Sequence, residues 1–245
     1  MIYMGSVADA RANRNYRVLP NGAGFWRSEL VTVEGGPQAF LVEQDPHSVV
    51  LPHFHFEDEF QVVIGGSGLL GRHALHPGFV HYAAKHTGYG PLTAGADGLA
   101  YLTLRAVLDL GAHFLPEERQ RMQPALRRNL FGSGAHLQHA GKDAIHRLHT
   151  RSVLPPQADG VAAWLLDVAP KTPVELPPPT GGDRFMLVTT GALSIGGTLA
   201  ASLSTIFVPQ DERDFDLGAG DQGVALLVVQ FARENVAAAS HADRC

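Results

Sequence analysis

The fold of this 245-residue chain is decided by one stretch, Leu51-Pro-His-Phe-His-Phe-Glu-Asp-Glu-Phe-Gln-Val-Val-Ile-Gly-Gly66. His53 and His55 are two residues apart, so on a strand both imidazoles leave the same face. Glu59 follows four residues later and can return to them across a tight turn. Two nitrogens and one carboxylate suit a divalent first-row metal that keeps positions open for water or substrate. The stretch therefore predicts a mononuclear metal site.

The same region recurs in altered form 125 residues later. Phe60-Gln-Val-Val-Ile-Gly-Gly66 aligns without gaps with Phe185-Met-Leu-Val-Thr-Thr-Gly191, and Leu99–Ala106 aligns with Val224–Phe231. Matching glycine and phenylalanine positions in one continuous register indicate an internal duplication. We therefore expect two similar domains.

The second copy lacks the predicted metal ligands. Where the first copy has its two histidines and glutamate, the second has Pro178, Thr180 and Arg184. The range Gly160–Glu234 contains no histidine at all. We therefore expect one metal site per chain, in the first domain, and a metal-free second domain.

Short apolar runs separated by glycine (27 residues) and proline (16 residues) predict an all-β fold. In the first half the expected strands are Gln38–Glu43, Val49–His55, Phe60–Ile64, Leu69–His73, Phe79–Ala83 and Leu99–Ala106. In the second half they are Ala162–Val168, Pro173–Leu176, Phe185–Thr190, Ala192–Ile195, Leu203–Val208 and Val224–Phe231. Between them, Pro116–Leu130 combines helix formers with Pro124 and predicts a short helical connector. The expected domains are residues 1–115 and 159–245, joined by a connector over 116–158.

The pattern His-x-His, three residues, Glu, six residues, Gly is filled by His53, His55, Glu59 and Gly66. It resembles the first motif of the cupin superfamily. The resemblance implies a bicupin, with two tandem double-stranded β-helix (jelly-roll) barrels, of which only the first retains metal ligands.

Cupins usually supply a third histidine from a second motif. The run Gly71-Arg-His-Ala-Leu-His-Pro-Gly-Phe-Val-His81 fits that motif if one residue is missing, and it makes His81 the favoured third imidazole. An alternative alignment places Tyr89 there, with His86 close by. Tyr89 is otherwise a candidate acid/base group near the metal. Gln61 shares the strand face of Glu59 and is a candidate hydrogen-bond partner of a ligand or the substrate.

Charge and composition exclude several classes of partner. A net charge of −5 without a Lys/Arg run argues against nucleic acid and anionic membranes. No apolar run approaches the roughly 18 to 20 residues of a membrane span. The single cysteine, Cys245, allows no intrachain disulfide. We expect a cytoplasmic protein that binds a small-molecule substrate, and a homodimer formed through exposed sheet edges.

The resemblance implies a metal-dependent enzyme acting on a small organic substrate. In its most concrete form it is a dioxygenase-type oxidoreductase with divalent iron held by His53, His55, Glu59 and His81. A manganese, nickel or zinc ion would favour isomerase or lyase chemistry instead. The alternative is a non-catalytic module that captures a ligand through its metal, because one fold hosts many functions.

Overall fold

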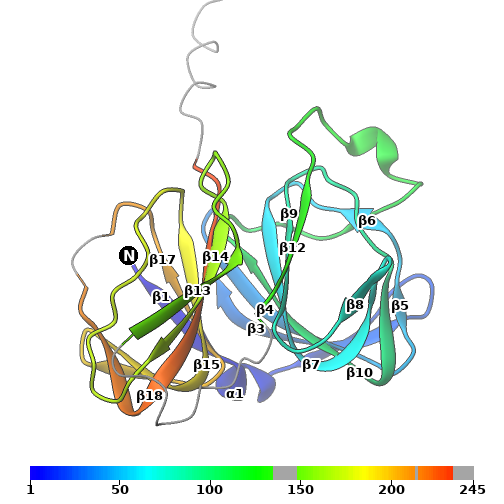
Figure 1. The fold of residues 1–245 in the computed structure, drawn as a ribbon. Coiled ribbons are helices and arrows are strands. Elements are labelled where there is room, and N and C mark those ends of the chain that lie inside the picture. The colour runs from blue at the N-terminus through cyan, green and yellow to red at the C-terminus, as the bar shows by residue number, and fades with distance from the viewer. Residues whose placement is uncertain (135–147, 213–214, 234–245) are drawn as a thin grey trace, which may run out of the picture.

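The computed structural model describes residues 1–134, 148–212 and 215–233, which form two β-barrels lying side by side (Figure 1). The first half contains β1 (Tyr3–Ser6), α1 (Val7–Arg11), β2 (Asn15–Val18), β3 (Gly24–Thr32), β4 (Gln38–Gln44), β5 (Val49–Val50), β6 (His53–Phe54), β7 (Glu59–Leu70), β8 (His73–Leu75), β9 (Phe79–Ala83), β10 (Leu92–Arg105), β11 (His113–Phe114), the 3-10 turn η1 (Arg119–Arg121) and β12 (Asn129–Ser133). The second half contains β13 (Leu148–Leu154), β14 (Ala162–Val168), β15 (Arg184–Ile195), β16 (Thr198–Ala201), β17 (Ser204–Val208) and β18 (Leu217–Gln230). Within these residues no helix is long and apolar enough to cross a membrane. Cys245 lies outside the described residues.

The predicted all-β duplication is confirmed. Strands β15, β17 and β18 begin and end 125 residues after β7, β9 and β10. The first barrel contains a nine-stranded antiparallel sheet with the central order β9-β7-β10-β4-β3, and a small β6–β11 sheet. The second barrel repeats this order as β17-β15-β18-β14 in a seven-stranded sheet. The three strand pairs also have equal lengths, so the loops between them span the same number of residues in both copies.

Glycine bends strands that the sequence pattern divides in two. The expected strand Phe60–Ile64 is extended to Leu70 in β7, whose pairing with β10 shifts register near Gly66. Of the expected strand Leu69–His73, the first two residues end β7 and His73 begins β8. Gly66 has a φ of +71°, and a Cβ there would lie 2.2 Å from the carbonyl oxygen of Gly98. Glycine tolerates both the dihedral and the close approach, so the chain makes a bulge where a turn was expected. By contrast, the expected strand Pro173–Leu176 is reduced to an isolated bridge at Pro173.

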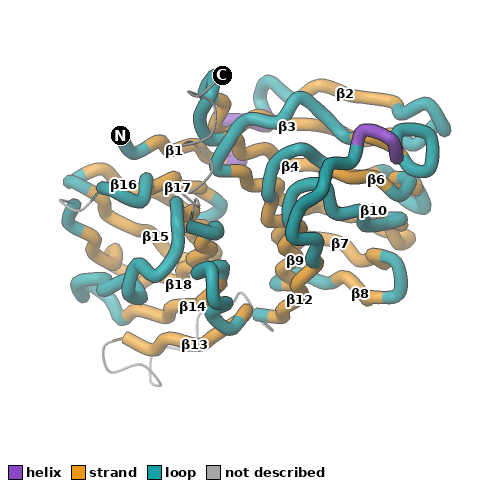
Figure 2. Tube along the Cα trace, turned by 90° about the horizontal axis from the view of Figure 1, so that it is seen from above, coloured by secondary structure: helices purple, strands orange, loops and turns teal. Residues whose placement is uncertain are grey.

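Three segments join the barrels across the expected boundaries. The first strand, β1, pairs with β17 of the second barrel, and α1 then returns the chain to β3 of the first (Figure 2). From residues 116–158, β12 pairs with β9 and β13 pairs with β14. The domain ranges 1–115, 116–158 and 159–245 therefore do not coincide with the paired sheets. Helix in the described part of the connector is confined to η1, with β12 and β13 taking up much of the rest.

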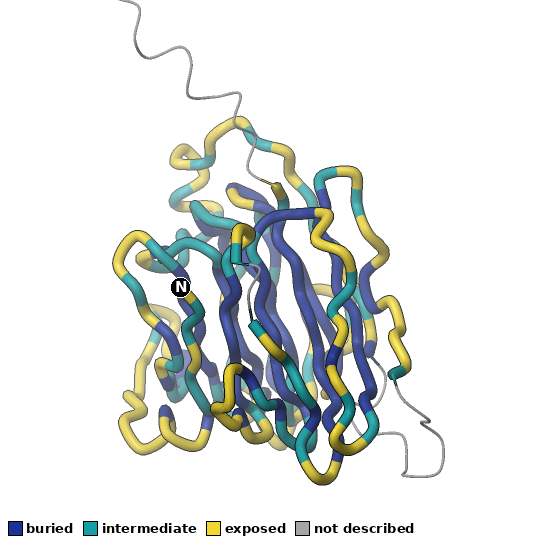
Figure 3. The backbone as a smooth tube through the Cα atoms, turned by 90° about the vertical axis from the view of Figure 1, so that its left-hand side faces the viewer, coloured by how far each residue is buried: buried dark blue, intermediate teal, exposed yellow. Residues whose placement is uncertain are grey.

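Apolar side chains form three cores, one inside each barrel and one between them. The strands that face the viewer in Figure 3 are buried along most of their length, and their connecting loops are exposed. In the core between the barrels the rings of Phe60 and Phe231 lie 5.0 Å apart at 83°. The two barrels thus share a sheet-on-sheet interface.

Candidate metal centre

The His-x-His stretch is held at one end of the first barrel by a broken strand. Pro52 separates β5 from β6, because proline has no N–H to donate to a sheet. His53 then pairs with Tyr89 through two backbone hydrogen bonds of 3.0 Å. The carbonyl of His55 accepts a hydrogen bond from the backbone N–H of His86 at 2.8 Å. These bonds fix the backbone on which both imidazoles stand.

Both imidazoles are anchored through Nδ1. His53 Nδ1 donates to the carbonyl oxygen of Leu51 at 2.7 Å, and His55 Nδ1 lies 3.0 Å from Asp109 Oδ1. Burial lowers the pKa of His53 to about 4, so this ring is neutral and its Nε2 carries a lone pair. In metal sites a ligating histidine typically holds one nitrogen against a carbonyl or carboxylate in this way and presents the other to the metal.

Glu59 opens β7 with its carboxylate buried between the two imidazoles and an arginine. Its Oε2 lies 3.8 Å from His55 Nε2 and accepts from Arg105 Nη2 at 2.6 Å. Its Oε1 accepts from the hydroxyl of Tyr89. Burial alone would raise the pKa of Glu59, but the charges of His55 and Arg105 and the Tyr89 hydrogen bond outweigh it and lower the pKa to about 2. The carboxylate is therefore ionised at neutral pH.

The Tyr89 hydroxyl lies where several acceptors meet. It is 2.8 Å from His53 Nε2, it contacts Glu59 Oε1, and it accepts from Gln61 Nε2 at 3.3 Å. Burial, followed by the charge of Glu59, raises the pKa of Tyr89 well above its usual value, so the hydroxyl keeps its proton. One proton cannot serve both His53 and Glu59. The described side chains thus leave one buried acceptor in excess, and a cation would satisfy it.

Arg105 takes part in the site although the sequence pattern did not single it out. Its Nη1 donates to Gln38 Oε1 at 2.8 Å, and its Nη2 lies 3.1 Å from both ring nitrogens of His55. Within the described residues, no three His, Cys, Asp or Glu side chains are already arranged to hold a metal. The structure therefore brings His53, His55 and Glu59 together, but it shares their donor atoms with Tyr89 and Arg105.

His81, the predicted third imidazole, lies beside Tyr89, with ring centroids 4.9 Å apart. Its Nδ1 is 3.0 Å from Gln61 Oε1 and its Nε2 is 2.9 Å from Asn129 Oδ1, so both nitrogens are engaged. The ring stacks on Phe131 with centroids 5.1 Å apart. Burial lowers its pKa to about 4. As placed, His81 supports Gln61, which in turn donates to Tyr89.

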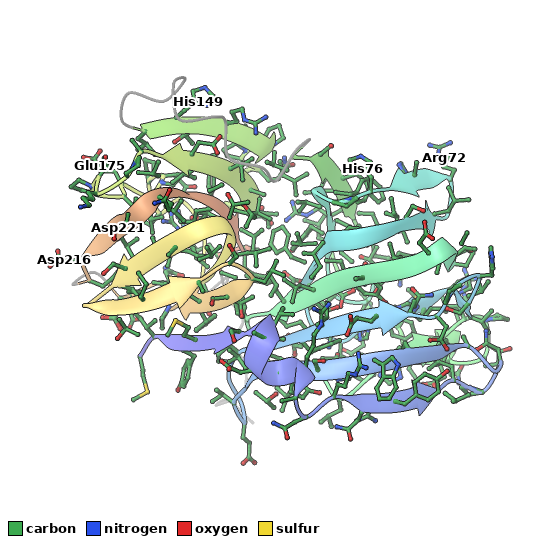
Figure 4. The ribbon with its side chains drawn as sticks, turned by 90° about the horizontal axis from the view of Figure 1, so that it is seen from below. Arg72, His76, His149, Glu175, Asp216 and Asp221 are labelled. Atoms are coloured by element: carbon green, nitrogen blue, oxygen red, sulfur yellow. The ribbon has the colours of Figure 1, made fainter. Side chains whose placement is uncertain are left out.

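The other histidines near this motif lie away from the carboxylate. The ring of His86 packs beside Phe54 and Phe56, with centroids 6.1 and 5.2 Å away. His76 projects from the outer edge of the first barrel, near Arg72 (Figure 4). Tyr89 and His86 were the alternatives to His81 as the remaining metal ligand, and of these two Tyr89 contacts Glu59.

Sequence reasoning missed Arg105, Asp109 and Asn129. A signal existed for Arg105, because a charge inside the apolar run Leu99–Ala106 is unusual and alternation places it on one face with Tyr101. Asp109 and Asn129 carried no such signal. They lie outside the barrel strands that hold the predicted ligands, and long-range folding brings them to His55 and His81.

A cavity of about 180 Å³ opens beside the predicted ligands. Its polar lining includes His53, His55, Glu59, Gln61, Tyr89, Tyr101, Thr103, Arg27 and Arg105. Its apolar lining includes Leu19, Phe25, Phe40, Val42, Val50, Ala112 and Phe114. The predicted site therefore faces a small chamber lined by both polar and apolar side chains.

The second barrel has different chemistry in the equivalent place. Arg184 and Gln230 occupy the positions of Glu59 and Arg105, and Arg184 Nε donates to Gln230 Oε1 at 2.9 Å. Gln230 Nε2 donates to Thr180 Oγ1 at 3.0 Å. In the second barrel an arginine stands where the first barrel has the carboxylate of Glu59. This position therefore provides no anionic ligand for a metal cation.

No protein-family model and no curated protein matches the sequence. Solved structures do match the fold. A candidate dioxygenase from Nostoc punctiforme has a TM-score of 0.63 at 15% identity, over 97% of this chain and 81% of that one. A bacterial pirin from Escherichia coli in complex with nickel(II) has a TM-score of 0.58 at 10% identity, over 96% and 100%. Oxalate decarboxylase from Bacillus subtilis, described with Mn(II) centres, has a TM-score of 0.57 at 13% identity, over 95% and 78%.

Proposed function

We propose that this chain, which has the cupin fold in two tandem copies, is a metal-dependent enzyme acting on a small organic substrate. Its single divalent transition metal would be held in the first barrel by His53, His55 and Glu59. Dioxygenase-type oxidation is the activity we favour, with iron as the metal and manganese, nickel or zinc as alternatives. The structural likeness to a candidate dioxygenase and to nickel- and manganese-containing proteins supports this choice.

The orientation of the two imidazoles carries the proposal. Leu51 and Asp109 engage the Nδ1 atoms of His53 and His55. The Nε2 of His55 then lies 3.8 Å from Glu59, and the Nε2 of His53 lies 2.8 Å from the Tyr89 hydroxyl. Two imidazole nitrogens and a carboxylate are a donor set that suits divalent iron, manganese, nickel or zinc. The excess acceptor at the Tyr89 hydroxyl also fits a cation. When bound, the metal supplies a Lewis-acidic centre with positions open to substrate and dioxygen.

The surrounding side chains have roles that follow from their contacts. Asp109 orients His55, and Gln61 orients the Tyr89 hydroxyl. Tyr89 can donate its proton to a substrate oxygen at the cavity wall. Arg105 offsets the buried charge of Glu59. The apolar walls keep bulk water from the reacting atoms, which strengthens each of these electrostatic interactions.

A second candidate is a metal-free isomerase or lyase. The observation that favours it is the guanidinium of Arg105, which already lies 2.6 Å from Glu59 and supplies a positive charge without a metal. In that case Tyr89 and His53, 2.8 Å apart, would form the proton-transferring pair. A cytoplasmic location and a homodimer remain predictions under either activity.

Metal analysis of protein purified without an affinity tag tests the proposal. We expect about one transition metal ion per chain after reloading, its loss in His53→Ala, and its retention in His76→Ala, whose histidine is exposed. Oxygen uptake would then be measured with catechols, diketones and flavonoids. Only a trace of metal in the reloaded wild type would refute the metal site. Turnover of an isomerase or lyase substrate in excess chelator would establish the second candidate.

A further inference from the structure

Two largely buried residues with hydroxyl groups line the cavity, and neither hydroxyl has a hydrogen-bond partner among the described residues. Tyr101 and Thr103 lie two residues apart on β10, on the same face as Arg105, and are 6% and 2% exposed. Neither hydroxyl oxygen is one of the fully buried side-chain atoms that lack a partner, so both are accessible from the cavity. These two are therefore suited to a ligand that supplies acceptors.

A guanidinium group lies in the same row of the sheet as Tyr101. Arg27 on β3 is opposite Val42, and Val42 is opposite Tyr101. The Arg27 guanidinium lies over the Phe40 ring, 3.6 Å from its centre, and its Nε donates to Glu29. Among the described residues, its two terminal nitrogens have no hydrogen-bond partner. Arg27 therefore lines the cavity and has two terminal nitrogens that no described residue engages.

Arg105 differs from Arg27 in this respect. Its nitrogens are taken up by Gln38, Glu59 and His55, so it is committed to the metal centre. Glu29 is 42% exposed and partly offsets the charge of Arg27. The remaining positive charge and the planar fork of Arg27 suit a planar monoanion such as a carboxylate, which accepts two parallel hydrogen bonds.

The size and walls of the cavity indicate what carries this carboxylate. An apolar cavity of about 150 Å³ holds benzene, and the volume here is about 180 Å³. Phe25, Phe40 and Phe114 contribute aromatic walls, and Val42 and Val50 contribute aliphatic ones. The chamber therefore has room for a single ring and little more.

We propose that the cavity binds a single-ring aromatic carboxylate, with the carboxylate on Arg27 and the ring between the aromatic walls. Tyr101 and Thr103 then donate to oxygen atoms of the ligand. This inference names the substrate class of the proposed enzyme and rests on that function for its chemistry. The binding itself uses no metal ligand, so it can be tested apart from the metal.

Calorimetric titration with benzoate and with benzamide, its uncharged analogue of similar shape, tests the proposal. In metal-depleted wild type we expect saturable benzoate binding and at least about tenfold weaker benzamide binding. Arg27→Gln should weaken benzoate binding by about tenfold and leave benzamide unchanged. Arg27→Lys keeps the charge without the fork and should give an intermediate loss. Arg72→Gln, at an exposed turn (Figure 4), should change neither.

Three results would overturn the inference: no saturable benzoate binding, equal binding of the two probes, or unchanged benzoate binding in Arg27→Gln. The thermal midpoint of each variant shows whether it is folded, and benzamide binding checks that the cavity is intact. If benzoate binds through Arg27 but the reloaded protein retains no metal, the proposed metal-dependent function fails and the anion site stands. If the reloaded protein retains metal but no variant loses benzoate binding, the anion site fails and the proposed metal-dependent function stands.

Discussion

Replacing Glu59 with glutamine tests the buried ion pair at the centre of the site. The side chains of Glu59 and Arg105 are only 1% and 3% exposed. Glutamine has nearly the shape of glutamate, but Tyr89 and Arg105 donate to different oxygens of Glu59, so the single amide oxygen can replace only one of these acceptors. The substitution therefore removes the negative charge and leaves the Arg105 guanidinium buried, with Asp109 as its nearest remaining carboxylate at 3.9 Å.

The size of the effect follows from the pKa of Glu59. A carboxyl whose pKa falls from 4.5 to about 2 on folding stabilises the folded state by about 3 kcal/mol at neutral pH. Breaking one partner of a buried ion pair typically costs about 3 to 5 kcal/mol. Both routes predict that Glu59→Gln lowers the free energy of unfolding by about 3 kcal/mol or somewhat more.

The pH dependence has a definite sign. Because folding lowers the pKa of Glu59, its contribution is complete above about pH 4.5 and is lost as the pH falls toward 2. The variant has no such group. The difference in stability between wild type and Glu59→Gln should therefore be constant from about pH 6 to pH 7 and fall to about half near pH 3.

Urea denaturation in the presence of chelator, followed by tryptophan fluorescence, measures this difference. Glu43→Gln is the matched control, because Glu43 pairs with Arg11 at 2.7 Å in a partly exposed bridge. It should cost less than about 1 kcal/mol. The reasoning is refuted if Glu59→Gln costs no more than the control, or if its cost is the same at pH 3 as at pH 7.

Asp109→Asn should weaken metal binding by about 10- to 100-fold, because His55 loses the carboxylate that orients its ring. Titration with chelator-buffered metal measures this, and an unchanged affinity would remove Asp109 from the site. Phe231→Ala should lower the free energy of unfolding by about 3 to 5 kcal/mol, because the ring packs against Phe60 between the barrels. Leu199→Ala, exposed on β16, is the control for both experiments and should change stability by less than about 0.5 kcal/mol. Equal losses in the two stability variants would contradict the shared core.

The parts of the fold that were predictable are those set by local spacing. Strands Phe79–Ala83 and Ala162–Val168 have the bounds expected from the apolar runs. The strands β1 and β2 were not predicted, because both are short and their apolar pattern is weak. Their partners, β17 and β3, supply the hydrogen bonds that make them strands.

The candidate site divides in the same way. The alternation of a strand placed His53 and His55 together, and a four-residue step returned Glu59 to them, so these three are neighbours as expected. The third imidazole could not be settled by spacing. His81 lies on the predicted strand, but its nitrogens are engaged by Gln61, 20 residues away, and by Asn129, 48 residues away.

The sequence by itself determined that this chain is a duplicated all-β protein with the predicted metal ligands in the first copy, because repeats and strand periodicity are local properties that need no partner. Only the tertiary structure decided that Arg105, 46 residues from Glu59, lies against the carboxylate and that Asp109, 54 residues from His55, orients the imidazole. Spacing along a strand sets which face a side chain occupies. Pairing between distant strands sets which groups it meets there, and those groups determine its charge and its hydrogen bonds.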